Sequence, residues 1–147
     1  MKSKKNIYSK DLGIDLSVKK ESELFKWFLA SILFGKPIQQ EVARRTYFEF
    51  IREGLTSPEA ILNAGWDKLV KVLDQGHYIR YDFSTATKLL EICKILKKEY
   101  GTLTNLFTGS SNLRVLRNSL LEFKGIGPVT TDIFLRDIKK SLLNFVA

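Results

Sequence analysis

Residues 121–133 decide the fold, and they read Leu-Glu-Phe-Lys-Gly-Ile-Gly-Pro-Val-Thr-Thr-Asp-Ile. This stretch predicts two helices joined by a tight turn. Gly125 can adopt the left-handed conformation that ends the first helix, and Pro128 suits the first turn of the second. Gly127 permits a close backbone approach, and Ile126 would be the apolar plug of the turn. The second helix would present unpaired N–H groups that can bind a phosphate, although a Gly-x-Gly between helices is equally typical of a purely structural turn.

The rest of the chain also favours helices. Residues 24–34 are almost continuously apolar, which at that length indicates a buried helix rather than a strand. Ser84 is expected to cap a helix that continues through Leu96. Other helices are expected at about 38–52, 58–65, 66–74, 113–123 and 128–138. Because no alternating strand pattern and no internal repeat occur, we predict an all-α fold: a compact multi-helix domain that contains the helix–turn–helix of residues 113–138.

The composition is that of one domain with a packed core. The chain has 147 residues, of which 44% are hydrophobic and 12% aromatic. Its 9 Gly and 3 Pro leave little room for disordered linkers. Residues 1–20 are polar and lysine-rich, so we expect a basic N-terminal arm followed by a single helical domain over 21–147.

The chain carries a large excess of positive charge. Lys and Arg number 24 against 16 Asp and Glu, a formal net charge of +8, and the isoelectric point is about 9.6. Such an excess favours a polyanionic partner, with nucleic acid ahead of an anionic membrane.

The rare residues exclude several kinds of site. Cys93 is the single cysteine, which excludes an intrachain disulfide, a cysteine-bound iron–sulfur cluster and a cysteine-bound zinc site. His77 is the single histidine, so no multi-histidine metal site can form. Neither a membrane span nor an apolar signal region is found. We therefore expect a soluble, cytoplasmic protein, monomeric and without cofactor or membrane partner.

Residues 121–133 resemble the helix–hairpin–helix of the endonuclease III-like (HhH-GPD) DNA glycosylase superfamily. The resemblance continues upstream in the order found in that family and covers about 23–135, roughly three-quarters of the chain. The segments that carry it are 29–46, 56–60 with 66–69, and 76–80 with 86–90. It implies a helical domain that binds double-stranded DNA in base excision repair.

The resemblance also implies a DNA-binding surface. The amides near Gly127, Val129 and Thr130 would hold a DNA phosphate, beside Lys124, Gly125 and Ile126 of the hairpin. The hairpin carbonyls of that family often bind a monovalent cation, and one can bind here. The family's wedge into DNA comes from the turn after the first long helix. That turn offers Lys36, Gln39 and Gln40 here to fill the space of a flipped base, or it is only a solvated helix start.

The sequence departs from the family at both catalytic positions. Val129 occupies the position of the lysine that the bifunctional members use, and valine cannot form a Schiff base. The catalytic aspartate position falls near Ala147, and no Asp or Glu follows Asp137. Asp82 and Lys124 are the remaining candidates for a catalytic role, although Asp82 at a helix start can simply complement the helix dipole.

The connector before residue 84 offers a further candidate for DNA contact. Arg80 can bind a phosphate, and the neighbouring Tyr78 and Tyr81 can stack on a base. Alternatively, the two rings pack beneath the connector and Arg80 is merely solvated.

Two functions from different classes follow. The first is a monofunctional DNA glycosylase-like enzyme that hydrolyses a damaged base from duplex DNA. The alternative is a non-catalytic helix–hairpin–helix module that recognises lesions or DNA structure, alone or beside a repair-protein partner. A third, weaker interpretation is a protein–protein module.

Overall fold

The computed structural model describes residues 6–141, and their side chains as far as residue 138. In that range all regular elements are helical, which confirms the all-α prediction. The seven α-helices there are α1 (Glu21–Phe34), α2 (Gln40–Arg52), α3 (Pro58–Gln75), α4 (Asp82–Ile95), α5 (Leu103–Thr108), α6 (Leu113–Leu121) and α7 (Pro128–Ser141). The aspartate position near Ala147 lies outside the described residues.

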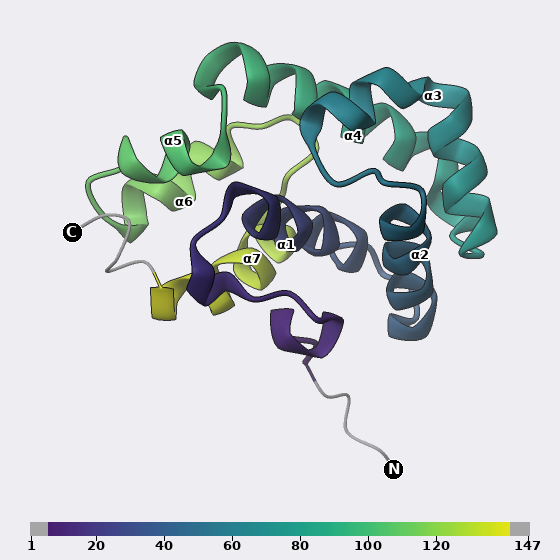
Figure 1. Cartoon of the computed structure of the whole chain (residues 1–147), viewed down its shortest axis with the longest axis horizontal. Helices are drawn as coiled ribbons and strands as arrows, with labels where there is room; N and C mark the ends of the chain where they lie inside the picture. Colours follow the sequence, from purple (N-terminus) through teal and green to yellow (C-terminus); the bar gives the residue numbers. More distant parts are fainter. Residues whose placement is uncertain (1–5, 142–147) are drawn as a thin grey trace.

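Helix α1 runs through the middle of the molecule, with α7 beside it and α2 and α5 against its other sides (Figure 1). Its side chains are buried almost all the way round, as the apolar run predicts. Trp27 of α1 donates its indole N–H to the carbonyl of Phe134 in α7 over 3.0 Å. The ring of Phe28 also packs edge-on against Phe134, with 5.4 Å between centroids. Helices α1 and α7 are therefore joined by both apolar and polar contacts.

The end of α1 lies directly against the first turn of α7. Gly35 follows α1, and a Cβ atom added there would overlap the Oγ1 atom of Thr130. Glycine is therefore required by packing, although its backbone is in the ordinary right-handed helical region. This close approach places Lys36, the next residue, beside the start of α7.

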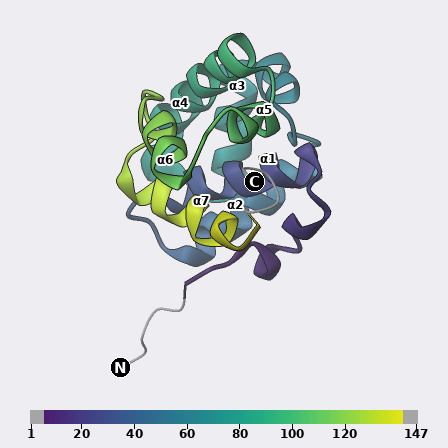
Figure 2. The same ribbon diagram turned by 90° about the vertical axis from the view of Figure 1, so that its left-hand side faces the viewer.

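Helices α3 and α4 pack along each other above α1 and α2 (Figures 1 and 2). The predicted break between helices 58–65 and 66–74 is a kink at Gly65, where φ is 79°. Ser57 caps α3 as predicted, accepting the amide of Ala60 over 3.1 Å. The prediction for Ser84 was wrong: α4 begins at Asp82, and Ser84 Oγ donates instead to the carbonyl of Tyr81.

Residues 6–20, part of the expected basic arm, lie on the helical domain. They form two short 3₁₀ turns, Ser9–Leu12 and Leu16–Val18. Leu12, Ile14 and Leu16 are buried there, and the amide of Ser9 donates to Asp137 of α7 over 2.6 Å. Its hydrogen bonds to α7 fall on Arg136 and Asp137, in the C-terminal half of that helix.

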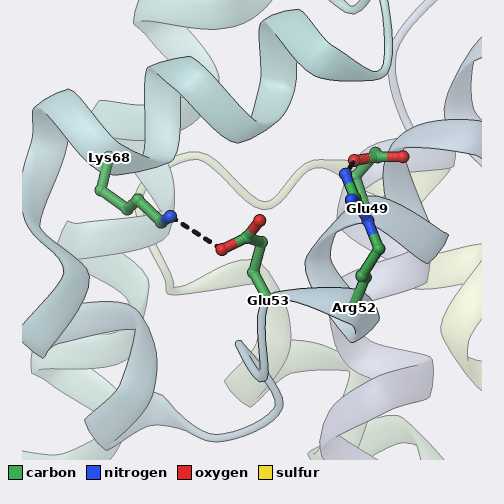
Figure 3. Close-up of polar contacts among 4 residues, drawn as sticks. All are labelled: Glu49, Arg52, Glu53 and Lys68. Carbon is green, nitrogen blue, oxygen red and sulfur yellow. Dashed lines mark hydrogen bonds and ion pairs between the residues drawn. The ribbon is translucent and has the colours of Figure 1, made fainter.

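The loop after α2 is tied to α3 by an ion pair (Figure 3). Lys68 Nζ lies 2.7 Å from Oε1 of Glu53, and Arg52 pairs with Glu49 on α2. The hydrogen bond and charge of Lys68 lower the pKa of Glu53. Because exposed ion pairs contribute little to stability, the packing of α2 and α3 depends mainly on their apolar faces.

We expect Gly35→Ala to destabilise the fold by about 1–3 kcal/mol, the usual range for overpacking a tight contact. The new Cβ would have to push Thr130 and α7 away. Urea denaturation measures the change. Gly127→Ala is the matched control, since a Cβ at Gly127 meets nothing within 4 Å. Equal stability of the two variants would contradict the close approach.

Candidate nucleic-acid interface

The turn between α6 and α7 has the backbone that its glycines and proline predict. Gly125 adopts a φ of 98°, the region that favours glycine. Ile126 is buried, and its amide donates to the carbonyl of Phe123 over 3.0 Å. Pro128 is the first residue of α7. The expected apolar plug and helix start are therefore present.

The N-terminus of α7 has amides that bond to no group of the described residues. The amide of Thr131 donates to the Gly127 carbonyl over 3.1 Å, as the first helical turn requires. Among the described residues, the amides of Gly127, Val129 and Thr130 donate no hydrogen bond. Gly127 has open space above it, and Val129 is 59% exposed. An anion can approach this helix end without displacing a side chain.

A cavity of about 390 Å³ lies beside this helix end, between the turn, the end of α1 and the start of α4. It brings together many of the residues predicted to contact DNA. These are Lys36, Gly125, Ile126, Gly127, Val129 and Thr130. Residues separated by most of the chain therefore form one surface.

Two lysines from different elements meet in this cavity. Lys36 from the turn after α1 and Lys88 from α4 both line it. The hydrogen bond from Lys88, together with burial and the positive charge of Lys88, lowers the pKa of Lys36 to about 8. In the described part of the chain, neither lysine forms an ion pair with a carboxylate. The cavity thus concentrates positive charge that the protein itself leaves uncompensated.

The other predicted basic residues lie around this cavity. Lys124 is exposed and lines a neighbouring hollow of about 580 Å³, which shares Lys88 and Gly125 with the first. Arg80 is exposed, with its guanidinium carbon 5.4 Å from the ring centroid of Tyr81. Lys36 Nζ lies 5.3 Å from the same centroid. The Tyr81 ring therefore links Arg80 to the lysine pair.

The structure does not bring the two glutamines of the expected wedge into the cavity. Gln39 precedes α2 and is exposed, and Gln40 is the first residue of that helix. Neither lines the cavity, whereas Lys36 of the same turn does.

Asp82 lies outside the cavity, at the first turn of α4. Its carboxyl accepts the amide of Phe83 over 2.7 Å and hydrogen-bonds to the carboxyl of Asp74. That hydrogen bond raises the pKa of Asp74, with burial and the charge of Asp82 acting in the same direction.

Tyr78, in the connector before residue 84, cannot stack on a base, which was one of the two interpretations of that segment. It is fully buried, and its hydroxyl donates to the carbonyl of Leu33. Burial also raises its pKa far above the ordinary value of a tyrosine. The packing alternative is therefore correct for Tyr78.

Several residues of this surface were not predicted from the sequence. Thr85 and Lys88 lie one turn apart on α4 and both line the cavity. Phe83 is 61% exposed, and its ring centroid lies 5.1 Å from that of Trp66. The i, i+3 spacing of Thr85 and Lys88 was visible, but nothing in it indicated that this face of α4 meets the α6–α7 turn.

Comparison with protein-family models, with curated proteins and with solved structures gave no match. None of the helices within residues 6–141 combines the length and apolar character needed to cross a bilayer. Over the same residues, no three His, Cys, Asp or Glu side chains gather in a group that could hold a metal ion. Function is therefore inferred from the geometry of the cavity and the α6–α7 turn.

We expect Lys88→Met to raise the pKa of Lys36 from about 8 toward its ordinary value of 10.5, since both the hydrogen bond and the adjacent charge are lost. An NMR titration of the lysine side chains, with Lys36→Arg for assignment, measures this pKa. Lys124→Met is the control and should leave it near 8. A Lys36 pKa that does not move in Lys88→Met would show that Lys88 does not set it.

The same pair makes stability depend on pH. Folded Lys36 loses its proton near pH 8 and unfolded lysine near 10.5, so the unfolded state binds more protons between these values. The free energy of unfolding of the wild type should therefore increase relative to that of Lys88→Met as the pH rises through this window.

Proposed function

We propose that this protein binds double-stranded DNA through the α6–α7 turn and the cavity beside it. The observation that carries the proposal is the convergence of unpaired amides at the N-terminus of α7 with the side chains of Lys36 and Lys88. Backbone amides at a helix start and lysine ammonium groups are both common ligands of DNA phosphates. The formal net charge of +8 favours the same partner.

Neighbouring groups extend this surface beyond one phosphate. Lys124 and Arg80 flank the lysine pair and can contact adjacent phosphates. The exposed ring of Phe83 lines the neighbouring hollow that contains Lys124, and the exposed ring of Trp66 packs against Phe83. Aromatic rings beside basic groups are typical of surfaces that bind unpaired bases. The resemblance to helix–hairpin–helix glycosylases supports the same mode of binding, in which the N-terminus of α7 points at the DNA phosphate backbone.

The resemblance implies hydrolysis of a damaged base, but the cavity favours the non-catalytic alternative. No Asp or Glu is among the described residues that line it, and Val129 offers no amine. A glycosylase needs a group that stabilises the cationic sugar or activates water. We therefore propose a DNA-binding module that recognises altered DNA, with hydrolysis as the competing function.

A monovalent cation fits the turn. Among the described residues, no hydrogen bond is donated to the carbonyls of Lys124, Gly125 and Ile126, whereas Thr131 occupies that of Gly127. Free carbonyl oxygens are suitable ligands for such an ion, which would add positive charge next to the DNA backbone.

Gly127→Val should weaken binding to every duplex by about tenfold or more, because the side chain would occupy the space through which a phosphate reaches the amides. Fold stability should change little, since a Cβ atom at Gly127 meets nothing within 4 Å. Fluorescence anisotropy with labelled duplexes at several salt concentrations measures both affinity and salt dependence. Unchanged affinity for all duplexes would refute the assignment of the turn.

A cleavage panel separates the module from the enzyme. Duplexes that carry uracil, hypoxanthine, an oxidised purine, an alkylated purine or an abasic site are incubated with the protein and then treated with alkali. We expect salt-sensitive binding and no cleavage. Alkali-dependent cleavage at one lesion would establish a hydrolytic glycosylase whose catalytic group lies elsewhere.

A further inference from the structure

We propose that the cavity lined by Thr85, Lys36 and Lys88 is a site for a terminal phosphate, as found at a nick or end of DNA. This inference rests on the proposed DNA binding for the identity of the ligand. It goes beyond it by naming a phosphomonoester, rather than an internal phosphodiester, as the group that the cavity prefers.

The charge of the cavity suits a dianion. The ammonium groups of Lys36 and Lys88, which line the same cavity, repel each other when both are protonated, and the N-terminus of α7 adds a partial positive charge. An internal phosphodiester brings one negative charge, whereas a terminal phosphate carries about −1.5 to −2 at pH 7. The terminal group therefore neutralises the lysine pair more completely and removes the repulsion.

A buried hydroxyl provides an independent indication of a ligand. Thr85 is only 1% exposed, and its Oγ1 has no hydrogen-bond partner in the described structure. Buried polar groups are nearly always paired, because an unpaired one loses its contacts with water without compensation. Thr85 lines the same cavity as the two lysines. Since its Oγ1 atom is itself covered, the Thr85 side chain must turn toward the cavity before a phosphate oxygen there can accept this hydrogen bond.

Two glycines allow the walls of the cavity to approach each other closely. A Cβ on Gly125 would lie 3.0 Å from Cγ of Lys88, and one on Gly35 would overlap Thr130. Larger residues at these positions would push apart the walls that hold the cations. The volume of about 390 Å³ is in the range of small-ligand pockets, so a phosphate with part of its sugar can enter.

The test compares the affinity of the full chain for four duplexes of one sequence. One is intact, one has a nick with hydroxyls on both sides, one has a 5′-phosphate at the nick, and one has a 3′-phosphate. We expect one phosphorylated nick to bind about tenfold more tightly than the hydroxyl nick, the gain of one charge-assisted hydrogen bond. Whether the 5′-phosphate or the 3′-phosphate gives the tighter binding tells which end of the DNA strand enters the cavity.

Thr85→Val identifies the site. Valine keeps the shape of threonine and removes the unpaired hydroxyl, so the melting temperature of the free protein should rise while the preference for the phosphorylated nick falls several-fold. Lys88→Met should reduce the same preference. Lys10→Gln removes one positive charge from a hollow near Asp137, toward the other end of α7, and should preserve the preference.

The outcomes distinguish the two proposals. Equal affinity for all nicks, with salt-sensitive binding of the intact duplex, overturns the terminal-phosphate site and leaves DNA binding intact. If Thr85→Val still prefers the phosphorylated nick as strongly as the wild type does, the terminal phosphate does not bind in the cavity beside Thr85. If no duplex binds, yet inorganic phosphate stabilises the wild type more than Thr85→Val, both the DNA-end inference and the proposed function fail and the cavity binds free phosphate instead.

Discussion

The contact between α1 and α7 is the constraint on which the remaining structure depends. The indole of Trp27 is bonded to the α7 backbone, and Gly35 allows the end of α1 to lie against Thr130. Because these contacts fix the start of α7 against the turn after α1, Lys36 lies at the wall of the cavity. The other wall comes from α4, which α3 holds in place above α1 (Figure 2). The candidate site is thus a consequence of core packing.

This packing brings together groups that repel one another. The unpaired amides of α7, Lys36 and Lys88 all favour a negative charge, and the pKa of Lys36 is lowered to about 8 in the absence of one. A bound anion would raise that pKa again and stabilise the fold, because a ligand that binds only the folded state shifts the equilibrium toward it. The packing of the helical core must offset the repulsion among these groups. An unfavourable arrangement maintained by a well-packed core is typical of a binding surface.

Local signals in the sequence were sufficient for most of the helices and for the α6–α7 turn, but they did not predict α5 (Leu103–Thr108). The apolar run at 24–34 and the Gly125-to-Pro128 turn are confirmed by burial and by backbone conformation. Contacts between distant segments were not predictable in this way. The pairing of Lys36 with Lys88 depends on how α1 and α4 pack, and no periodicity records it. Ser84 failed as a cap because a 3₁₀ turn at Ile79–Tyr81 leads directly into α4 and starts it earlier. Reasoning from the sequence thus identified the α6–α7 turn and Lys36, and it missed the face of α4 that completes the cavity.

The central claim is that the start of α7 and the turn after α1 form one anion-binding surface. The most direct measurement is an amide NMR titration of the protein with a short duplex. The account predicts that the largest shifts cluster at Gly127, Val129 and Thr130, together with Lys36. Shifts confined to the residues of Figure 3, none of which lines the cavity, or no shifts at any concentration, would contradict it.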